Sequence, residues 1–241
     1  PIYHPKEFYS HKYTVNKDSS IPDLRSTIFW DANVVTDENG KAKISFYAAD
    51  LKRVEQLLPV KNMWTWLEKE FPEKHNAYKI VFSPLIGGSH STQKYYAMDQ
   101  TKKAWFSETV MFICDADRYD AREELSETEK QGLMSGIVFT EIDHNYVNPV
   151  SSKYAKQIQE IYSSKIWTDE KNSFYKNPLS IFNEYMTHAI FCLWAMENFD
   201  QKTSNLVIEE RVKMNRDRRG FVKFKEFVHL VKSLGCMVGM E

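Results

Sequence analysis

Two segments of the chain place a glutamate and a histidine about one helical turn apart. Glu141 and His144 stand three positions apart in FTEIDHNY, and Glu184 and His188 stand four apart in FNEYMTHA. On an α-helix both spacings put the two side chains on one face. A carboxylate and an imidazole on one face can bind the same divalent metal ion, and two such turns on packed helices would supply up to four ligands.

Both pairs lie in apolar stretches, which predicts that they are buried. An unpaired charge in the protein interior costs on the order of several kcal/mol, so each group needs a partner there. A metal ion is one such partner, and a buried hydrogen-bonded cluster without metal is the other. A third arrangement, a di-metal carboxylate site, requires further inward-facing carboxylates, which the sequence does not identify.

Helices are expected at the positions that carry these pairs. The segment Ser126–Glu129 has the spacing of a capping box and begins the long helix that contains the first pair. Asn177 as N-cap and Pro178 at the first helical position begin the helix that contains the second pair. Two further amphipathic helices are predicted, over Val60–Phe71 and Phe221–Leu234.

A short antiparallel sheet is expected beside these helices. Two apolar runs, Tyr78–Leu85 and Ser107–Cys114, are predicted to be neighbouring strands, and the first would bind a substrate backbone by strand addition. The segment Gly87–Thr92 between them, which contains His90, is predicted to be a flexible turn. The basic turn Arg216–Gly220 is interpreted as solvated; the alternative is that Arg216, Arg218 and Arg219 bind a substrate carboxylate or phosphate.

Several longer segments resemble a known family. FTEIDHNYVNP, NPLSIFNEYMTHAIFCLW and YKIVFSPLIGGSHST, with MWTWLEKEFP and RRGFVKFKEF, resemble a Bacteroidetes-type domain-of-unknown-function family, family 4932, which is similar to the gluzincin metallopeptidases. The resemblance covers Leu51 to Leu234 and implies an α+β, zincin-like fold. A gluzincin HExxH helix supplies two zinc ligands and the general base, and a later glutamate supplies the third ligand. The resemblance therefore implies that Glu141 is the base and that His144 and Glu184 are ligands.

Thr140 stands where the HExxH pattern has its first histidine. A threonine hydroxyl is a poor zinc ligand, and two protein ligands bind zinc weakly. Three outcomes follow. His90 or His188 replaces the missing ligand; Glu141 itself coordinates, in a set suited to zinc, manganese or iron; or the site is inactive and the scaffold is kept for binding.

The expected function is metal-dependent hydrolysis of a peptide or protein substrate, with zinc as the expected ion. Glu141 would accept the proton of the metal-activated water. Tyr185 would either donate its hydroxyl to the oxyanion or pack in the core with its hydroxyl at the rim. Asp143 would either orient a histidine or lie exposed on its helix. The alternative is a catalytically inactive, zincin-like binding protein of the bacterial cell envelope.

Composition bounds the remaining possibilities. The 241 residues include 32 basic and 33 acidic side chains, and the net charge of −1 removes the positive field on which nucleic-acid binding usually depends. No stretch reaches the roughly 18 apolar residues of a membrane span. Residues 1–50 contain the hairpin signal Asn39-Gly40 and resemble β-sandwich modules of exported bacterial cell-surface proteins. We therefore expect an N-terminal β-hairpin appendage over 1–50, a zincin-like domain over 51–241 and export to the periplasm or cell surface, with the oligomeric state left open.

Overall fold

The computed structural model describes most of the chain that follows residue 52. The chain separates into two compact units, Pro1–Lys52 and Arg53–Glu241, and every element described below belongs to the second. The hairpin expected at Asn39-Gly40 lies outside the described residues. The described residues are 53, 56–82, 90–113, 119, 121–171 and 174–238, with the backbone alone at 104, 105 and 235–238.

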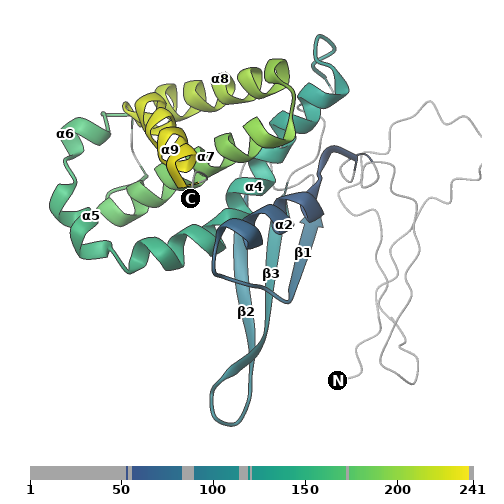
Figure 1. Cartoon of the computed structure of the whole chain (residues 1–241), viewed down its shortest axis with the longest axis vertical. Coiled ribbons are helices and arrows are strands. Elements are labelled where there is room, and N and C mark those ends of the chain that lie inside the picture. The colour runs from purple at the N-terminus through teal and green to yellow at the C-terminus, as the bar shows by residue number, and fades with distance from the viewer. Residues whose placement is uncertain are drawn as a thin grey trace, which may run out of the picture. The chain divides into compact units, whose positions relative to one another are not determined.

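The second unit is a helix-rich α+β fold with one small sheet, which confirms the expected fold class at this level (Figure 1). None of the described helices has the length and apolar character needed to cross a membrane. In chain order the elements are α2 (Val60–Glu70), β1 (Ala77–Phe82), β2 (Ser91–Met98), β3 (Ala104–Ile113), α4 (Glu127–Ser152), α5 (Ala155–Ile161), α6 (Ser164–Trp167), α7 (Pro178–Asn198), α8 (Gln201–Asp217) and α9 (Phe224–Val238).

The sheet is mixed, with strand order β1-β3-β2. β2 pairs antiparallel with β3, whereas β1 pairs parallel with β3, with Ala77 opposite Glu108. The expectation of an antiparallel sheet is therefore wrong for β1: residues 99–103 join β2 to β3 as a hairpin, and β1 pairs in parallel with the other side of β3. β2 is a strand that the sequence does not predict, and it begins at Ser91, inside the segment expected to be a turn. Figure 1 shows the β2–β3 hairpin extending beyond the helices.

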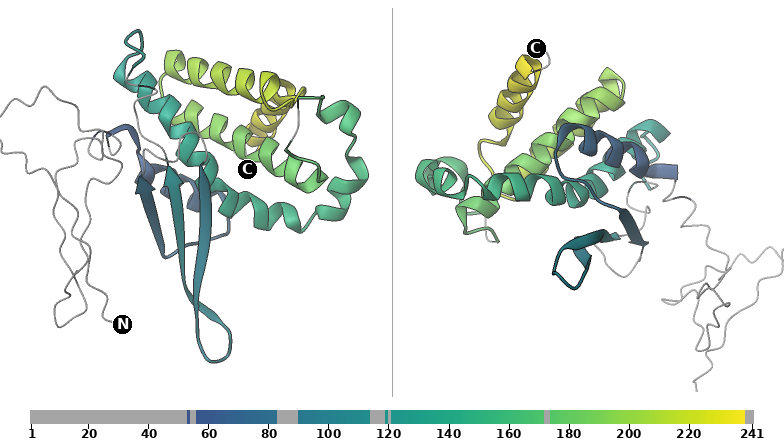
Figure 2. Two further views of the ribbon diagram at one scale, coloured as in Figure 1. Left: turned by 180° about the vertical axis from the view of Figure 1, so that it is seen from behind. Right: turned by 60° about the horizontal axis from the view of Figure 1, so that its bottom comes forward.

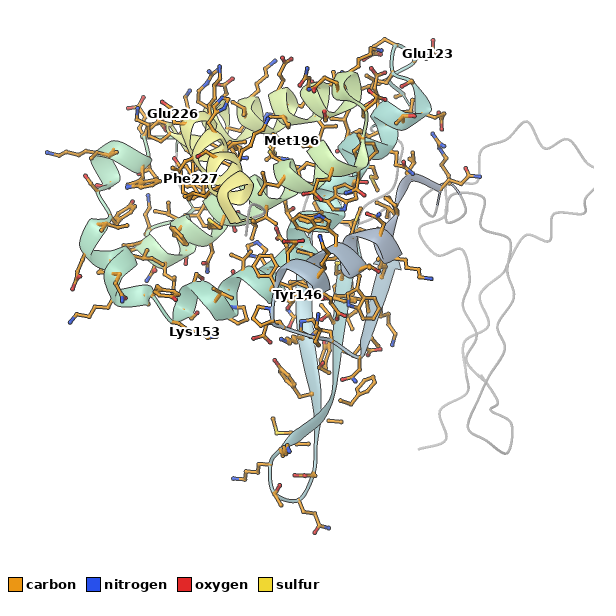
Figure 3. The ribbon with its side chains drawn as sticks, in the orientation of Figure 1. Glu123, Tyr146, Lys153, Met196, Glu226 and Phe227 are labelled. Carbon is orange, nitrogen blue, oxygen red and sulfur yellow. The ribbon has the colours of Figure 1, made fainter. Side chains whose placement is uncertain are left out.

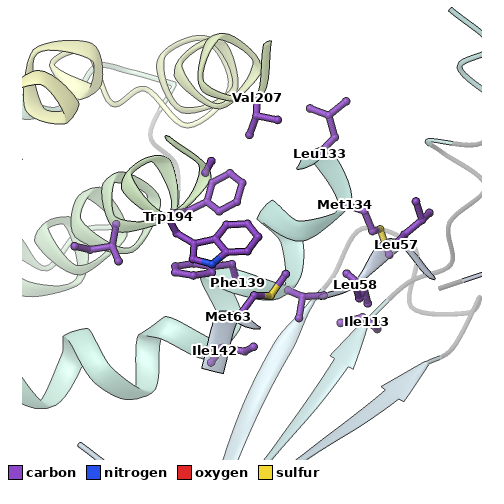
Figure 4. Close-up of a cluster of buried hydrophobic side chains, with 14 of the residues drawn as sticks. Leu57, Leu58, Met63, Ile113, Leu133, Met134, Phe139, Ile142, Trp194 and Val207 are labelled. Carbon is purple, nitrogen blue, oxygen red and sulfur yellow. The ribbon is translucent and has the colours of Figure 1, made fainter. Parts of the chain in front are cut away.

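α4 is the helix around which the others are arranged. It packs against α2, β2 and β3 on one side and against α7 and α8 on the other, while α9 packs on α7 (Figure 2). The hydrophobic core forms at these contacts: Phe139 of α4 and Trp194 of α7 are fully buried, with ring centroids 5.2 Å apart (Figure 4). The Trp194 indole donates to Asn62 Oδ1 of α2 at 2.8 Å, so the core also fixes α2.

Two glycines one turn apart allow α8 to lie close to α4. A Cβ atom at Gly132 would lie 2.7 Å from Val207 Cγ2, and a Cβ at Gly136 would lie 1.7 Å from Arg211 Nη2. Both distances are too short for real contacts, so a side chain at either position would require the α8 residue to move. The spacing of the two glycines therefore determines how closely the helices pack.

Both predicted starts of the helices that carry the Glu/His pairs are confirmed. At the start of α4, Ser126 Oγ accepts from the Glu129 amide at 3.3 Å, and the Glu129 carboxylate accepts from the Ser126 amide at 2.8 Å, which completes the capping box. At the start of α7, the Asn177 side chain accepts from two amides of the first turn, and Pro178 occupies the first helical position. These caps set where each helix begins and hence which residues face the α4–α7 contact.

Ser126→Ala should lower the free energy of unfolding by about 1 kcal/mol, because it removes one half of the capping box. Ser152→Ala changes an exposed hydroxyl at the C-terminal end of the same helix and is the matched control, with an expected change below about 0.5 kcal/mol. Urea denaturation of the three proteins measures both values. Equal effects of the two substitutions would contradict a stabilising role for the box.

Candidate functional site

The carboxylate of Glu184 lies between the two histidines that the sequence pairs with glutamates. His144 Nε2 of α4 is 3.4 Å from Glu184 Oε1, and His188 Nε2 of α7 is 3.8 Å from Glu184 Oε2. The structure therefore brings together three predicted site residues from two packed helices. Two arginines complete this group, which we call the Glu184 cluster: Glu184, His144, His188, Arg211 and Arg219.

Arg219 supplies a positive charge to the cluster. Its guanidinium donates to Glu184 Oε2, whose side chain is only 12% exposed, and also to the Tyr175 hydroxyl at 3.4 Å. The sequence-based interpretation placed Arg219 in a solvated turn, but the turn after α8 directs it to a mostly buried carboxylate. A buried carboxylate needs such a partner, because desolvation of an unpaired charge is costly.

His144 presents the ring nitrogen that a metal ligand would use. Its Nδ1 lies 3.3 Å from Asn148 Oδ1, which accepts a hydrogen bond when Nδ1 carries the hydrogen. In that tautomer the Nε2 lone pair faces Glu184 Oε1 at 3.4 Å, as two ligands of one metal ion would. Two ligand atoms about 2.1 Å from a tetrahedral ion lie roughly 3.4 Å apart, so the spacing suits such a pair.

Thr140 provides no third ligand in this arrangement. Its hydroxyl donates to Gly136 O at 2.9 Å, one turn back along α4, and the residue is buried. Catalytic zinc sites use three protein ligands, and the atoms in place here are one from His144 and one from Glu184. In the described part of the chain, no group of three or more His, Cys, Asp or Glu side chains has the geometry to hold a metal ion. Thr140 therefore supplies no ligand here, and His90 and His188 stay the predicted replacements.

Glu141 lies beside the cluster on α4. Burial raises the pKa of its carboxyl group, as does the Glu184 carboxylate, while His144 and Arg219 act in the opposite direction. A raised pKa brings a carboxylate closer to the range in which it can accept and return a proton near neutral pH. This property agrees with the role expected for Glu141 and does not by itself establish a reaction.

His188 is almost fully buried, with 2% of its surface exposed. Burial lowers the pKa of its imidazole well below the ordinary value, and the positive charges of Arg219 and Arg211 lower it further. The ring is therefore neutral at physiological pH. Its Nδ1 lies 3.2 Å from Arg211 Nη1, so the two ring nitrogens face different partners, Arg211 and Glu184.

Asp143 is buried beneath the cluster rather than exposed on its helix. Within the described residues neither of its carboxylate oxygens has a hydrogen-bond partner. Burial raises the pKa of this carboxyl group well above its ordinary value, and Glu141 and Glu184 raise it further. The folded chain therefore favours the protonated form of Asp143 more than the unfolded chain does. Of the two roles weighed for Asp143, the exposed one is excluded.

Neither Tyr185 nor His90 is among the residues whose contacts define the Glu184 cluster. The Tyr185 hydroxyl donates to Trp167 O at 2.6 Å and accepts from the Lys223 amide at 3.2 Å, so no O–H remains for an oxyanion in this arrangement. Its ring packs 5.3 Å from that of Phe227 on α9, which Figure 3 labels. His90 directly precedes β2, and its role as a replacement ligand stays a prediction.

Arg211 is the cluster residue that sequence reasoning misses entirely. It lies on α8, a helix that the sequence does not predict, and no local pattern distinguishes it from the other basic residues of that helix. The one available signal is remote: Gly136 interrupts the apolar pattern of α4 at the position that faces Arg211.

The sequence and structure were compared with known proteins. No family model, no curated protein and no solved structure matches the chain.

The raised pKa of Asp143 predicts a specific pH dependence of stability. A carboxyl pKa above the ordinary value of 3.8 means that the folded chain binds this proton more tightly than the unfolded chain does. The Asp143 contribution to the free energy of unfolding therefore falls as the pH rises above about 4. Asp143→Asn removes this titration, so the variant should gain stability relative to the parent as the pH rises from about 4 toward neutrality.

Urea denaturation across this pH range provides the measurement. Glu160→Gln removes an exposed carboxylate of α5 and is the control that should follow the parent at every pH. A stability difference between Asp143→Asn and the parent that does not change with pH would contradict the burial of an unpartnered carboxyl group.

Proposed function

We propose that this chain is a zincin-like domain that binds an extended peptide beside the Glu184 cluster without cleaving it. The observation that carries the proposal is the position of Thr140. Its hydroxyl is bonded back to Gly136, so the cluster keeps two of the three ligands that a gluzincin-type zinc site requires. The remaining parts of a peptidase-like centre, Glu141 and the paired His144 and Glu184, are retained next to one another.

The edge of the sheet supports the peptide as the bound molecule. β2 is an edge strand, and within the described residues no further strand pairs with its outer backbone groups. It begins next to the candidate site, because Asn145 Nδ2, adjacent to His144, lies 3.4 Å from Thr92 Oγ1. Farther along, Tyr95 and Tyr96 are about half exposed, at 54% and 50%. An extended peptide that adds to β2 would pair its backbone with this strand and pass near Asn145, the α4 residue that follows His144.

A metal-dependent peptidase is the second candidate, and two observations favour it. The 3.4 Å separation of His144 Nε2 and Glu184 Oε1 suits two ligands of one ion, and the raised pKa of Glu141 suits a general base. This candidate requires a third ligand, which His90 or the bound peptide itself would supply. The resemblance of residues 1–50 to modules of exported proteins bears equally on both candidates, and we propose on that ground a peptide partner in the cell envelope.

Thr140→His restores the missing ligand position and separates the two candidates. The parent chain, purified without chelator, should contain no stoichiometric zinc and should not hydrolyse an unstructured polypeptide such as denatured casein. Thr140→His should bind about one zinc per chain and hydrolyse the same polypeptide, because three ligands and Glu141 are then present. Elemental analysis and a peptide-release assay give both readouts.

The double variant Thr140→His/Glu141→Gln is the matched control and should keep the zinc while losing the hydrolysis. Stoichiometric zinc in the parent chain that disappears in His144→Ala would overturn the proposal in favour of the peptidase. A Thr140→His protein that binds zinc but hydrolyses no peptide would contradict the placement of a peptide at this site.

A further inference from the structure

Arg211 reaches the candidate site from a different helix. From α8 its side chain enters the contact between α4 and α7, where its guanidinium lies 4.7 Å from the ring centre of Phe191. Its Nη1 atom lies 3.2 Å from His188 Nδ1. The Arg211 guanidinium thus stacks on the face of the Phe191 ring and points at Nδ1 of the buried His188 imidazole.

The chemistry of the two groups determines which nitrogen of His188 carries the hydrogen. A guanidinium has only donors, so a hydrogen bond from Arg211 requires an accepting lone pair on His188 Nδ1. In a neutral imidazole the hydrogen then resides on Nε2. The Nε2–H group faces Glu184 Oε2 at 3.8 Å, where its partial positive charge favours the carboxylate, although the distance is too long for a direct hydrogen bond.

Gly136 is the residue that makes room for this arrangement. A Cβ at position 136 would lie 1.7 Å from Arg211 Nη2 and 2.8 Å from Phe191 Cε1. A side chain there would collide with the guanidinium in its observed place, and the flexible end of Arg211 is the part that would move. The glycine of α4 and the arginine of α8 therefore form a matched pair.

We infer that Arg211 is a positioning residue that holds His188 in its Nε2–H tautomer and that Gly136 admits it. In this form His188 directs a hydrogen at Glu184 and has no Nε2 lone pair for a metal ion. Arg219 and His188 then both face Oε2, which leaves Oε1 to His144. This role goes beyond the proposed peptide binding, which needs neither Arg211 nor a particular tautomer of His188.

The other ionisable groups around His188 are compatible with this assignment. Glu184 and Arg219 lie on the Nε2 side, His144 lies across the same carboxylate, and the unpartnered Asp143 carboxyl group interacts with Arg211. Burial of the ring disfavours the doubly protonated form, so the ring carries a single N–H hydrogen.

Long-range ¹H–¹⁵N correlation spectra of ¹⁵N-histidine-labelled protein at neutral pH read the tautomer directly. His188→Gln assigns the signal. In the parent chain His188 should show an unprotonated Nδ1 and a protonated Nε2, and a protonated Nδ1 or a mixture of both forms would overturn the inference. The tautomer is read in the parent chain itself, and His188→Gln serves only to assign the signal.

Two substitutions test the cause of the tautomer. Arg211→Met removes the donor, and Gly136→Ala displaces it, so in both variants His188 should change to a mixture of tautomers. Gly132→Ala perturbs the same α4–α8 contact at Val207, one turn away from Arg211, and should leave the parent tautomer unchanged. A parent-like spectrum in Arg211→Met, or equal changes in Gly132→Ala and Gly136→Ala, would show that Arg211 does not position His188. Zinc content and peptide hydrolysis test the proposed function separately.

Discussion

The neutralisation of the Glu184 carboxylate is the interaction on which the centre of this fold depends. The group is largely withdrawn from water, and its charge is balanced by Arg219 from the turn after α8 and faced by histidines of α4 and α7. Removal of one member of such a buried set leaves the remaining charges uncompensated, which costs more than the set contributes as a whole. The relative positions of α4, α7 and the end of α8 are therefore coupled through one side chain.

α4 can serve this centre because its two sides have different environments. One side faces the sheet and α2, where Tyr78 donates from its hydroxyl to that of Tyr146 at 2.8 Å. The other side faces α7 and α8, where Gly136 leaves space for a guanidinium and the ring of Phe139 closes the apolar core beside it. Tyr146, labelled in Figure 3, thus belongs to the sheet-facing side and not to the Glu184 cluster.

Local sequence signals predict the parts of the fold that local interactions determine. The capping box at Ser126 and the Asn177-Pro178 start are confirmed because each is satisfied within one turn of helix. The one-turn spacing of glutamate and histidine likewise finds residues that the structure brings together. The sequence does not predict β2 because none of its side chains is fully buried, so the strand shows only a weak apolar pattern. Backbone pairing with β3 holds it in place. The contact of Arg219 with Glu184 is not predicted for a related reason, since the two residues lie 35 positions apart in the chain.

The charge balance of the centre also bears on the threonine at position 140. In a zinc-dependent site the metal neutralises the ligating glutamate, so the scaffold depends on the ion. Here Arg219 already binds Glu184, and Arg211 contributes a second positive charge within reach of His188. A divalent cation added between His144 and Glu184 would face both arginines, and their repulsion would act together with the missing ligand to weaken its binding. Because Arg219 pairs with Glu184, threonine at position 140 does not leave that carboxylate unpaired, and the Thr140 hydroxyl donates to the Gly136 carbonyl. The helices can thus pack around a buried carboxylate whose charge is neutralised by the protein's own cations.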